Sequence, residues 1–194
     1  MIEGAPRVPY PDFQRAPEAI RSEDSRTFLR AWHRWRGDNL LPRRSDFHLA
    51  DIKPLLPRLL LLEVRSAREI VFRLAGTMVR ARVGAELTGR NFIDLARPEE
   101  RAERARLLLA EVAQPCGAVM IYPLAYPSGY EAPVEVVSVP VEPNQPHEAK
   151  LVLALFTELF KPEGEIPASI DQHLAPGKRV SFFDIGGGVP SITA

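Results

Sequence analysis

The chain of 194 residues has one cysteine, no net charge and no long apolar run. The single cysteine, Cys116, excludes an internal disulfide and any zinc site built on several cysteines, and it fits a reducing compartment. Basic and acidic residues number 25 each, so bulk charge points to neither nucleic acid nor an acidic membrane surface. No apolar run approaches the ~20 residues that a membrane-spanning helix needs, and residues 1–13 lack the apolar core of a signal peptide. We therefore expect a cytoplasmic protein that neither spans a membrane nor binds nucleic acid.

The composition is that of a folded domain with extensions. Hydrophobic residues make up 45% of the chain and charged residues 26%, which is enough apolar material for a packed core. Four prolines within residues 1–21 disfavour helix there, which predicts a loose leader. The pattern then predicts a helix over residues 22–37, one domain over residues 38–162 and a partly ordered tail over residues 163–194.

Residues 22–37 have the pattern of an amphipathic helix. Ser22 is suited to cap its start and Gly37 to end it. The apolar stripe consists of Phe28, Leu29, Trp32 and Trp35. The opposite face is basic, so either the stripe packs on the domain, or it pairs with a second copy, or the basic face contacts nucleic acid. The lack of a partner helix for a helix-turn-helix argues against nucleic acid, and the other two interpretations stay open.

Alternating apolar and polar residues predict two strands, 58–65 and 69–76, joined as a hairpin. In the second strand, strict alternation places Phe72 and Leu74 on one face and Arg73 on the other.

A helix and three more strands follow. Pro98 in the first turn and Pro115 beyond the end predict a helix over residues 98–114. Its expected buried stripe is Ala102, Ala105, Leu109 and Val112. Strands are predicted at 117–125, 132–141 and 150–159, and their short connections favour antiparallel pairing.

The segment "GAELTGRNF", residues 84–92, resembles a phosphate-binding loop in its glycine spacing. A phosphate loop must follow a parallel strand directly and open a helix, whereas "TMVRARV" precedes Gly84 and the next helix is delayed until Pro98. The glycines are better explained by a sharp turn of the backbone, which is a conformational role.

The order of elements and the segment "ELTGRNFIDLARPEER", residues 86–101, resemble the PAS sensory domain. The resemblance implies an α+β fold with a five-stranded antiparallel sheet, short helices and one longer helix between strands two and three, preceded by an N-terminal helix. It also implies a cavity between the sheet and the short helices.

The chain further resembles a bacterial, mostly alphaproteobacterial, single-domain PAS subfamily over roughly residues 28–160. The matching positions are Trp35, Arg36, Gly37, Leu41, Pro42, Arg43, Leu56, Pro57, Arg73, Leu74, Ala75, Gly76 and Thr77. That resemblance implies no established enzymatic activity.

The known cofactors of PAS domains find little support in this sequence. The four histidines are scattered, which argues against a metal site, and residues 77–114 contain none, which disfavours haem. Covalent flavin binding needs a cysteine where this chain has "GRNFIDL", so it is excluded. The cofactor, if one exists, is unknown.

Candidate ligand contacts lie where the resemblance places the cavity wall. They are Arg73, Thr77, Arg80, Tyr122 and Tyr130. Arg73 either reaches an anionic ligand or pairs with an acidic neighbour, because buried arginine is usually paired. No nucleophile elbow is present, and Glu63, Glu86 and Glu135 are expected to point outward, so no catalytic residue is assigned.

The sequence thus predicts a non-catalytic sensory or regulatory module that senses a small ligand, contacts a protein partner, or does both. A homodimer is expected, with the stripe on the leading helix as the candidate interface. The alternative is a small enzyme on a curved sheet like that of ketosteroid isomerase, which the helix between strands two and three argues against.

Overall fold

A computed structural model describes residues 18–125, 131–145, 147–160 and 179–191. Its centre is one antiparallel sheet with the strand order β2-β1-β5-β4-β3-β6. The strands are β1 Leu59–Ser66, β2 Glu69–Ala75, β3 Gly117–Ala125, β4 Glu131–Val141, β5 Lys150–Glu158 and β6 Arg179–Phe183. The hairpin and the three later strands are confirmed. The predicted number of five strands is wrong, because β6, from the region assigned to a tail, pairs with β3 as a sixth.

Helices surround the sheet. The α-helices are α1 Glu23–Arg36, α2 Thr77–Val83 and α3 Arg101–Ala113. The 3₁₀ helices are η1 Arg44–Asp46, η2 Leu49–Arg58, η3 Phe92–Leu95 and η4 Pro98–Glu100. The leading helix and the helix between the second and third strands are confirmed, and η1 and η2 occupy a region without a predicted element.

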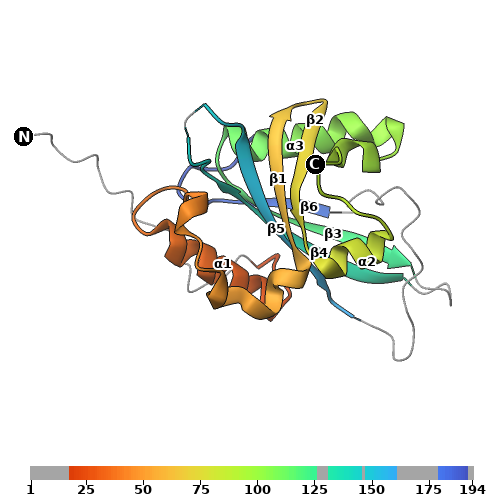
Figure 1. Cartoon of the computed structure of the whole chain (residues 1–194), viewed down its shortest axis with the longest axis horizontal. Helices are drawn as coiled ribbons and strands as arrows, with labels where there is room; N and C mark the ends of the chain where they lie inside the picture. The colour runs from red at the N-terminus through yellow and green to blue at the C-terminus, as the bar shows by residue number, and fades with distance from the viewer. Residues whose placement is uncertain (1–17, 126–130, 146, 161–178, 192–194) are drawn as a thin grey trace, which may run out of the picture.

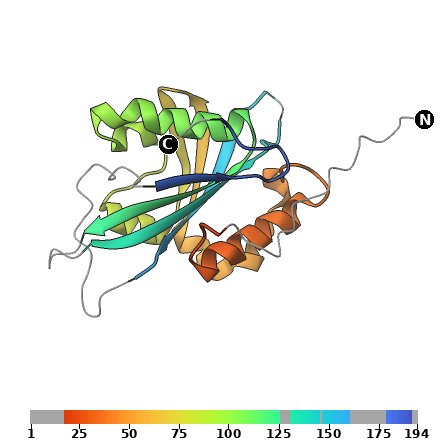
Figure 2. The same ribbon diagram turned by 180° about the vertical axis from the view of Figure 1, so that it is seen from behind.

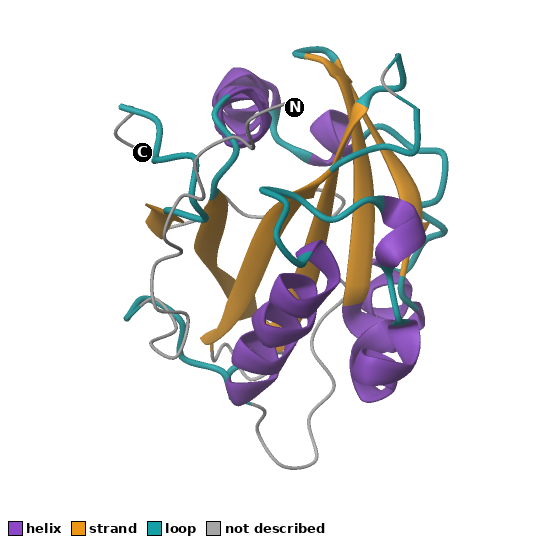
Figure 3. Cartoon of the chain, turned by 90° about the vertical axis from the view of Figure 1, so that its left-hand side faces the viewer, coloured by secondary structure: helices purple, strands orange, loops and turns teal. Residues whose placement is uncertain are grey.

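Both faces of the sheet are covered. Figure 1 shows α3 above the strands and α1 below them, and the side view in Figure 3 also has helices on both sides. The face under α2, η3 and α3, called here the inner face, is lined by apolar residues such as Leu62, Phe72 and Val136. The outer face, which α1 and η2 cover, is lined by residues such as Leu61 and Val137.

Helix α1 is fixed to the outer face by its apolar stripe. Phe28, Leu29, Trp32 and Trp35 are all buried there. The indole N–H of Trp32 donates to the carbonyl oxygen of Pro140 at 3.1 Å, so the polar atom of this ring is satisfied inside the core. Of the two roles left open for the stripe, packing on the domain is the one seen in this chain.

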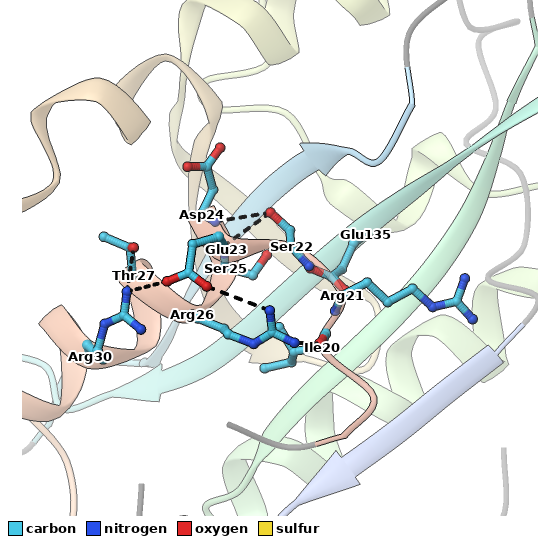
Figure 4. A network of polar contacts seen from close by, with 10 residues as sticks. All are labelled: Ile20, Arg21, Ser22, Glu23, Asp24, Ser25, Arg26, Thr27, Arg30 and Glu135. Atoms are coloured by element: carbon cyan, nitrogen blue, oxygen red, sulfur yellow. Dashed lines mark hydrogen bonds and ion pairs between the residues drawn. The ribbon is translucent and has the colours of Figure 1, made fainter. Parts of the chain in front are cut away.

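The start of α1 is held from two sides (Figure 4). The side chain of Ser22 accepts from the backbone N–H groups of Asp24 and Ser25, as expected for a helix N-cap. The carboxylate of Glu135 on β4 accepts from the backbone N–H of Arg21 at 2.6 Å and from that of Ser22 at 3.2 Å. Glu135 has no exposed surface, so the prediction that it points outward is wrong.

The glycine pair in residues 84–92 serves the backbone. Gly84 ends α2 with a left-handed φ of 69°, and Gly89 has φ of 84°. The N–H of Gly89 donates to the oxygen of Phe72, and the N–H of Phe72 donates to the oxygen of Arg90. Asn91 adds its side-chain oxygen as acceptor for the N–H of Ile70. These bonds cover the edge of β2, which fits the predicted conformational role.

Two expected burial patterns are wrong in detail. The pairing of β1 with β2 slips between Leu61 and Leu62, opposite Arg73, so strict alternation is lost and Leu74 is 45% exposed. In α3 the residues with buried side chains are Arg104, Ala105, Leu108 and Glu111. Ala102 is exposed, because the face that α3 turns to the sheet lies further round the helix.

Candidate functional site: buried polar groups beneath helix α3

The buried face of α3 carries two ionisable side chains. Arg104 and Glu111 are seven residues apart, which is about two helical turns, so both project from the same side of the helix. That side packs on the inner face of the sheet, where Leu108 lies between them in the apolar cluster. Charged side chains are seldom this buried, so each needs an explanation.

Glu111 is the more enclosed of the two, with 1% of its surface exposed. One carboxyl oxygen, Oε2, accepts a hydrogen bond from the hydroxyl of Ser138 on β4 at 2.9 Å. The other, Oε1, is buried and has no hydrogen-bond partner among the described residues. Burial raises the pKa of Glu111 to about 8, and the hydrogen bond from Ser138 opposes this only in part. The carboxyl group is therefore mostly protonated at neutral pH and able to donate a hydrogen bond.

Arg104 lies nearer the start of α3. Its guanidinium carbon is 5.0 Å from the ring centre of Phe92 on η3, within the range of a cation–π contact. Burial lowers its pKa, against the raising influence of Tyr122 and Glu100. One carboxyl oxygen of Glu100 is also buried without a hydrogen-bond partner in the described part of the chain.

Tyr122 extends the polar groups onto β3. Its hydroxyl lies 3.2 Å from the sulfur of Met120, to which it donates a weak hydrogen bond. Burial raises the pKa of Tyr122, while the charge of Arg104 lowers it. The phenol is therefore a neutral donor and acceptor within the electrostatic reach of Arg104.

Cys116 follows the end of α3 and is completely buried. Burial, with smaller contributions from Glu111 and Asp184, raises its pKa to about 12. A thiol with such a pKa is protonated at physiological pH, so it has the character of a small packing residue and not of a nucleophile.

The residues predicted to contact a ligand are not brought together. Arg73 is about half exposed on β2, and its Nε lies 3.2 Å from Glu63 on the neighbouring strand. Thr77 is exposed at the start of α2, and Arg80 forms an ion pair with Glu86. Tyr122 belongs to the inner-face cluster, whereas Tyr130 lies outside the described residues.

Arg104, Glu111 and Ser138 were not among the residues predicted from the sequence. The helical spacing of residues 104, 108 and 111 was the available signal, because it places two polar residues in line with a leucine that packs on the sheet. Ser138 lies in the apolar strand β4, and a single serine in such a strand does not indicate a functional site.

The geometry suits hydrogen bonding to a small polar molecule better than covalent chemistry. It supplies a neutral carboxyl group, a phenol and a guanidinium on an otherwise apolar face, the mixture typical of ligand sites. In the part of the chain that the structure describes, no cluster of three histidine, cysteine or carboxylate side chains is placed to hold a metal ion. Nor does any described helix combine the length and apolar character that a membrane crossing requires.

A family model described as "PAS domain" matches residues 20–157. The chain therefore belongs to the PAS domain family, whose members are typically sensory and regulatory modules without catalytic activity. The match spans α1 and the strands β1 to β5, and ends before β6.

Among solved structures, one titled "Structure of the PAS domain from Bordetella pertussis BvgS" is similar to this chain, at 14% identity and a TM-score of 0.42. The similarity covers 58% of this chain and 87% of that one. A search of curated proteins found no match. Nothing in these comparisons supports the alternative of a ketosteroid-isomerase-like enzyme.

Proposed function

We propose that this chain is a cytoplasmic, non-catalytic sensory module of bacterial signalling that binds a small ligand beneath α3 and contacts a separate protein partner. The inner face between the sheet and the helices α2, η3 and α3 is the proposed site. The ligand is a small molecule with a hydrogen-bonding group that faces Glu111 and an apolar body that contacts the surrounding leucines and valines.

The observation that carries the proposal is Oε1 of Glu111, a buried atom that has no hydrogen-bond partner among the described residues. A buried polar atom without a hydrogen bond costs ~1–3 kcal/mol, and a purely structural core would favour an apolar residue at this position. A ligand that accepts a hydrogen bond from the protonated carboxyl group removes that cost. Family membership supports the sensory role, since PAS domains are sensory and regulatory modules.

The residues predicted from the sequence to contact a ligand differ in how close they lie to the proposed site. Tyr122 shares the inner face with Arg104 and Glu111, so we expect direct contact. Arg73, Thr77 and Arg80 lie at or near the surface, where they are suited to an entrance or to a partner. Tyr130 keeps its proposed role as a ligand contact.

A homodimer also remains part of the proposal. The stripe of Phe28, Leu29, Trp32 and Trp35 is buried against its own sheet, so pairing through it requires α1 to leave the outer face. Pairing through another surface requires no such change. Light scattering of the wild-type chain over a range of concentrations measures the mass, and a constant monomer mass would remove pairing from the proposal.

The ligand is tested by native mass spectrometry of freshly purified protein. We expect an additional mass on the wild-type chain that Glu111→Leu, which removes the polar atoms, does not retain. Glu99→Leu, at an exposed position before α3, is the matched control and should retain the mass. A wild-type chain without added mass, stabilised by no compound of a metabolite set in thermal unfolding, would contradict ligand binding.

A further inference from the structure

The sixth strand lies outside the part of the chain that the family model matches. β6 and the residues after it lie beyond the matched range of 20–157. Figure 2 shows β6 in blue along the edge of the sheet beside β3, with the following segment passing between the ends of α3 and α1. Five residue pairs join the two strands, from Gly117 opposite Phe183 to Ile121 opposite Arg179. Without β6, the edge of β3 would expose a row of unpaired backbone groups.

At the edge of β3, Gly117 leaves room for an aromatic ring. A Cβ atom at Gly117 would lie 2.0 Å from the ring of Phe183, so only glycine leaves room for that ring. Phe183 is 9% exposed and belongs to the apolar cluster on the outer face. The pairing register of β6 is thus fixed by an aromatic side chain placed across a glycine.

The residues that follow β6 contact a buried arginine, Arg36. The Nη1 of Arg36, at the end of α1, donates to the carbonyl oxygen of Ile185 at 2.6 Å and to that of Leu40 at 3.1 Å. The side chain of Ile185 is completely buried in the outer-face cluster. Arg36 therefore binds the main chain of this segment, while the isoleucine fills an apolar site.

Three glycines complete the contact. The amide of Gln114, just after α3, donates to the oxygen of Gly187 at 3.2 Å. A Cβ at Gly187 would lie 2.8 Å from the oxygen of Pro115, and Gly186 and Gly188 have positive φ. The carboxylate of Asp184 accepts the N–H groups of both outer glycines and shapes this turn.

The receiving residues come from α1, from β3 and from the residue just after α3, and all of them lie within the matched range. Two of the side-chain contacts, from Arg36 and Gln114, are to backbone oxygens, and the strand pairing is also backbone to backbone. Proteins that bind extended peptides by strand addition recognise the main chain in this way, and they have pockets for a few of the side chains.

We propose that the β3 edge, with Gly117, Arg36 and Gln114, is a peptide-docking surface for a partner protein, and that residues 179–188 occupy it in the same chain until the partner replaces them. The partner presents an extended strand with an aromatic residue, a large aliphatic residue two positions later, and then glycines. These features are those of residues 179–188 of this chain, which bind the same surface. Tethering gives it an effective concentration of the order of mM, so a partner binds only when it pairs better or when the segment is released.

The test uses the full chain and a fluorescent synthetic peptide of residues 179–190, "RVSFFDIGGGVP". The double variant Phe183→Ala/Ile185→Ala weakens the tethered segment and leaves the receiving residues intact. By fluorescence anisotropy, we expect this variant to bind the peptide at least about tenfold more tightly than the wild type. Adding Gly117→Val should abolish binding, because the valine side chain occupies the space that the phenylalanine ring of the peptide needs. Equal binding to wild type and double variant, or no binding to the double variant, would overturn the proposal.

Hydrogen exchange of the wild-type chain provides a measurement that does not depend on the variants. We expect the amides of β6 to exchange through a local opening, at least tenfold faster than the slowest amides of β4 and β5. If β6 exchanges only together with β4 and β5, the segment does not detach separately and the proposal fails.

Discussion

The carboxylate of Glu135, buried on β4, accepts the backbone N–H of Arg21 at 2.6 Å and so joins the start of α1 to the centre of the sheet across 114 positions of sequence. The contact is to main chain, so it fixes where α1 begins whatever side chain stands at position 21. This buried carboxylate therefore has a structural role, because it joins α1 to the sheet.

Replacing Glu135 with alanine should destabilise the chain by about 3 kcal/mol. The substitution leaves two N–H groups, of Arg21 and Ser22, without their acceptor, and hydrogen bonds to charged groups contribute ~1.5–3 kcal/mol. Glu135→Gln keeps one oxygen and should cost about half as much. The free energy of unfolding in urea measures both effects.

The control for Glu135 is Glu142→Gln. Glu142 is half exposed and contacts the equally exposed Lys150 at 3.1 Å. An exposed ion pair contributes less than ~1 kcal/mol. If the Glu142 variant loses as much stability as Glu135→Ala, the buried contact has no special role.

The stability of the wild type relative to Glu111→Gln should decrease as the pH rises. Because folding raises the pKa of Glu111 from 4.5 to about 8, the folded chain keeps a proton in this range that the unfolded chain releases. The contribution is fully present below pH 4.5 and is lost as the pH rises toward 8, at about 1.4 kcal/mol per pH unit. Urea unfolding of both proteins at a series of pH values provides the difference.

Taking that difference also removes the contribution of His33. Its pKa is lowered by burial and by Arg36, so its contribution to stability increases with pH, opposite in sign to that of Glu111. His33 is present in both proteins and cancels. A difference between wild type and Glu111→Gln that is constant from pH 5 to 8 would be incompatible with a buried, protonated Glu111.

Two glycines should respond differently to alanine. A Cβ at Gly76 would lie 2.2 Å from the oxygen of Pro57, so Gly76→Ala forces η2 away from α2 and should cost about 3 kcal/mol or more. Gly89 has φ of 84° but open space around the Cβ position, so Gly89→Ala should cost only ~1–2 kcal/mol of backbone strain. Thermal unfolding distinguishes them, and equal losses would contradict the close contact at Gly76.

Two arginine–glutamate pairs give a further comparison. The Nε of Arg82 on α2 lies 2.6 Å from Glu158 on β5, and both side chains are mostly buried. Arg82→Met leaves that carboxylate without its partner and should cost about 2 kcal/mol, whereas Arg73→Met, at an exposed pair, should cost less than ~1 kcal/mol. Chemical denaturation of both variants measures this. A large loss for Arg73→Met would show that its pairing with Glu63 matters more than its exposure suggests.

The elements with local signals could be predicted from the amino-acid sequence. The hairpin, the three later strands, the leading helix with its Ser22 cap and the turn at Gly84 all follow from alternation, helical spacing and residues with special backbone preferences. The resemblance to the PAS domain followed from the same local segments, and the match over residues 20–157 confirms it.

The tertiary structure alone decided which polar groups are buried. Arg104 and Glu111 read as ordinary polar positions of an amphipathic helix, and their burial depends on the angle at which α3 meets the sheet. Glu135 lies in an alternating strand, and it became internal only because α1 covers the face that alternation alone would leave to solvent. β6 is five residues long, too short for its own residue pattern to predict a strand. Its pairing with β3 and the packing of Phe183 over Gly117 therefore define it. Local preferences act over a few residues of chain, whereas burial and strand pairing depend on segments distant in sequence, which is why only the folded structure places them.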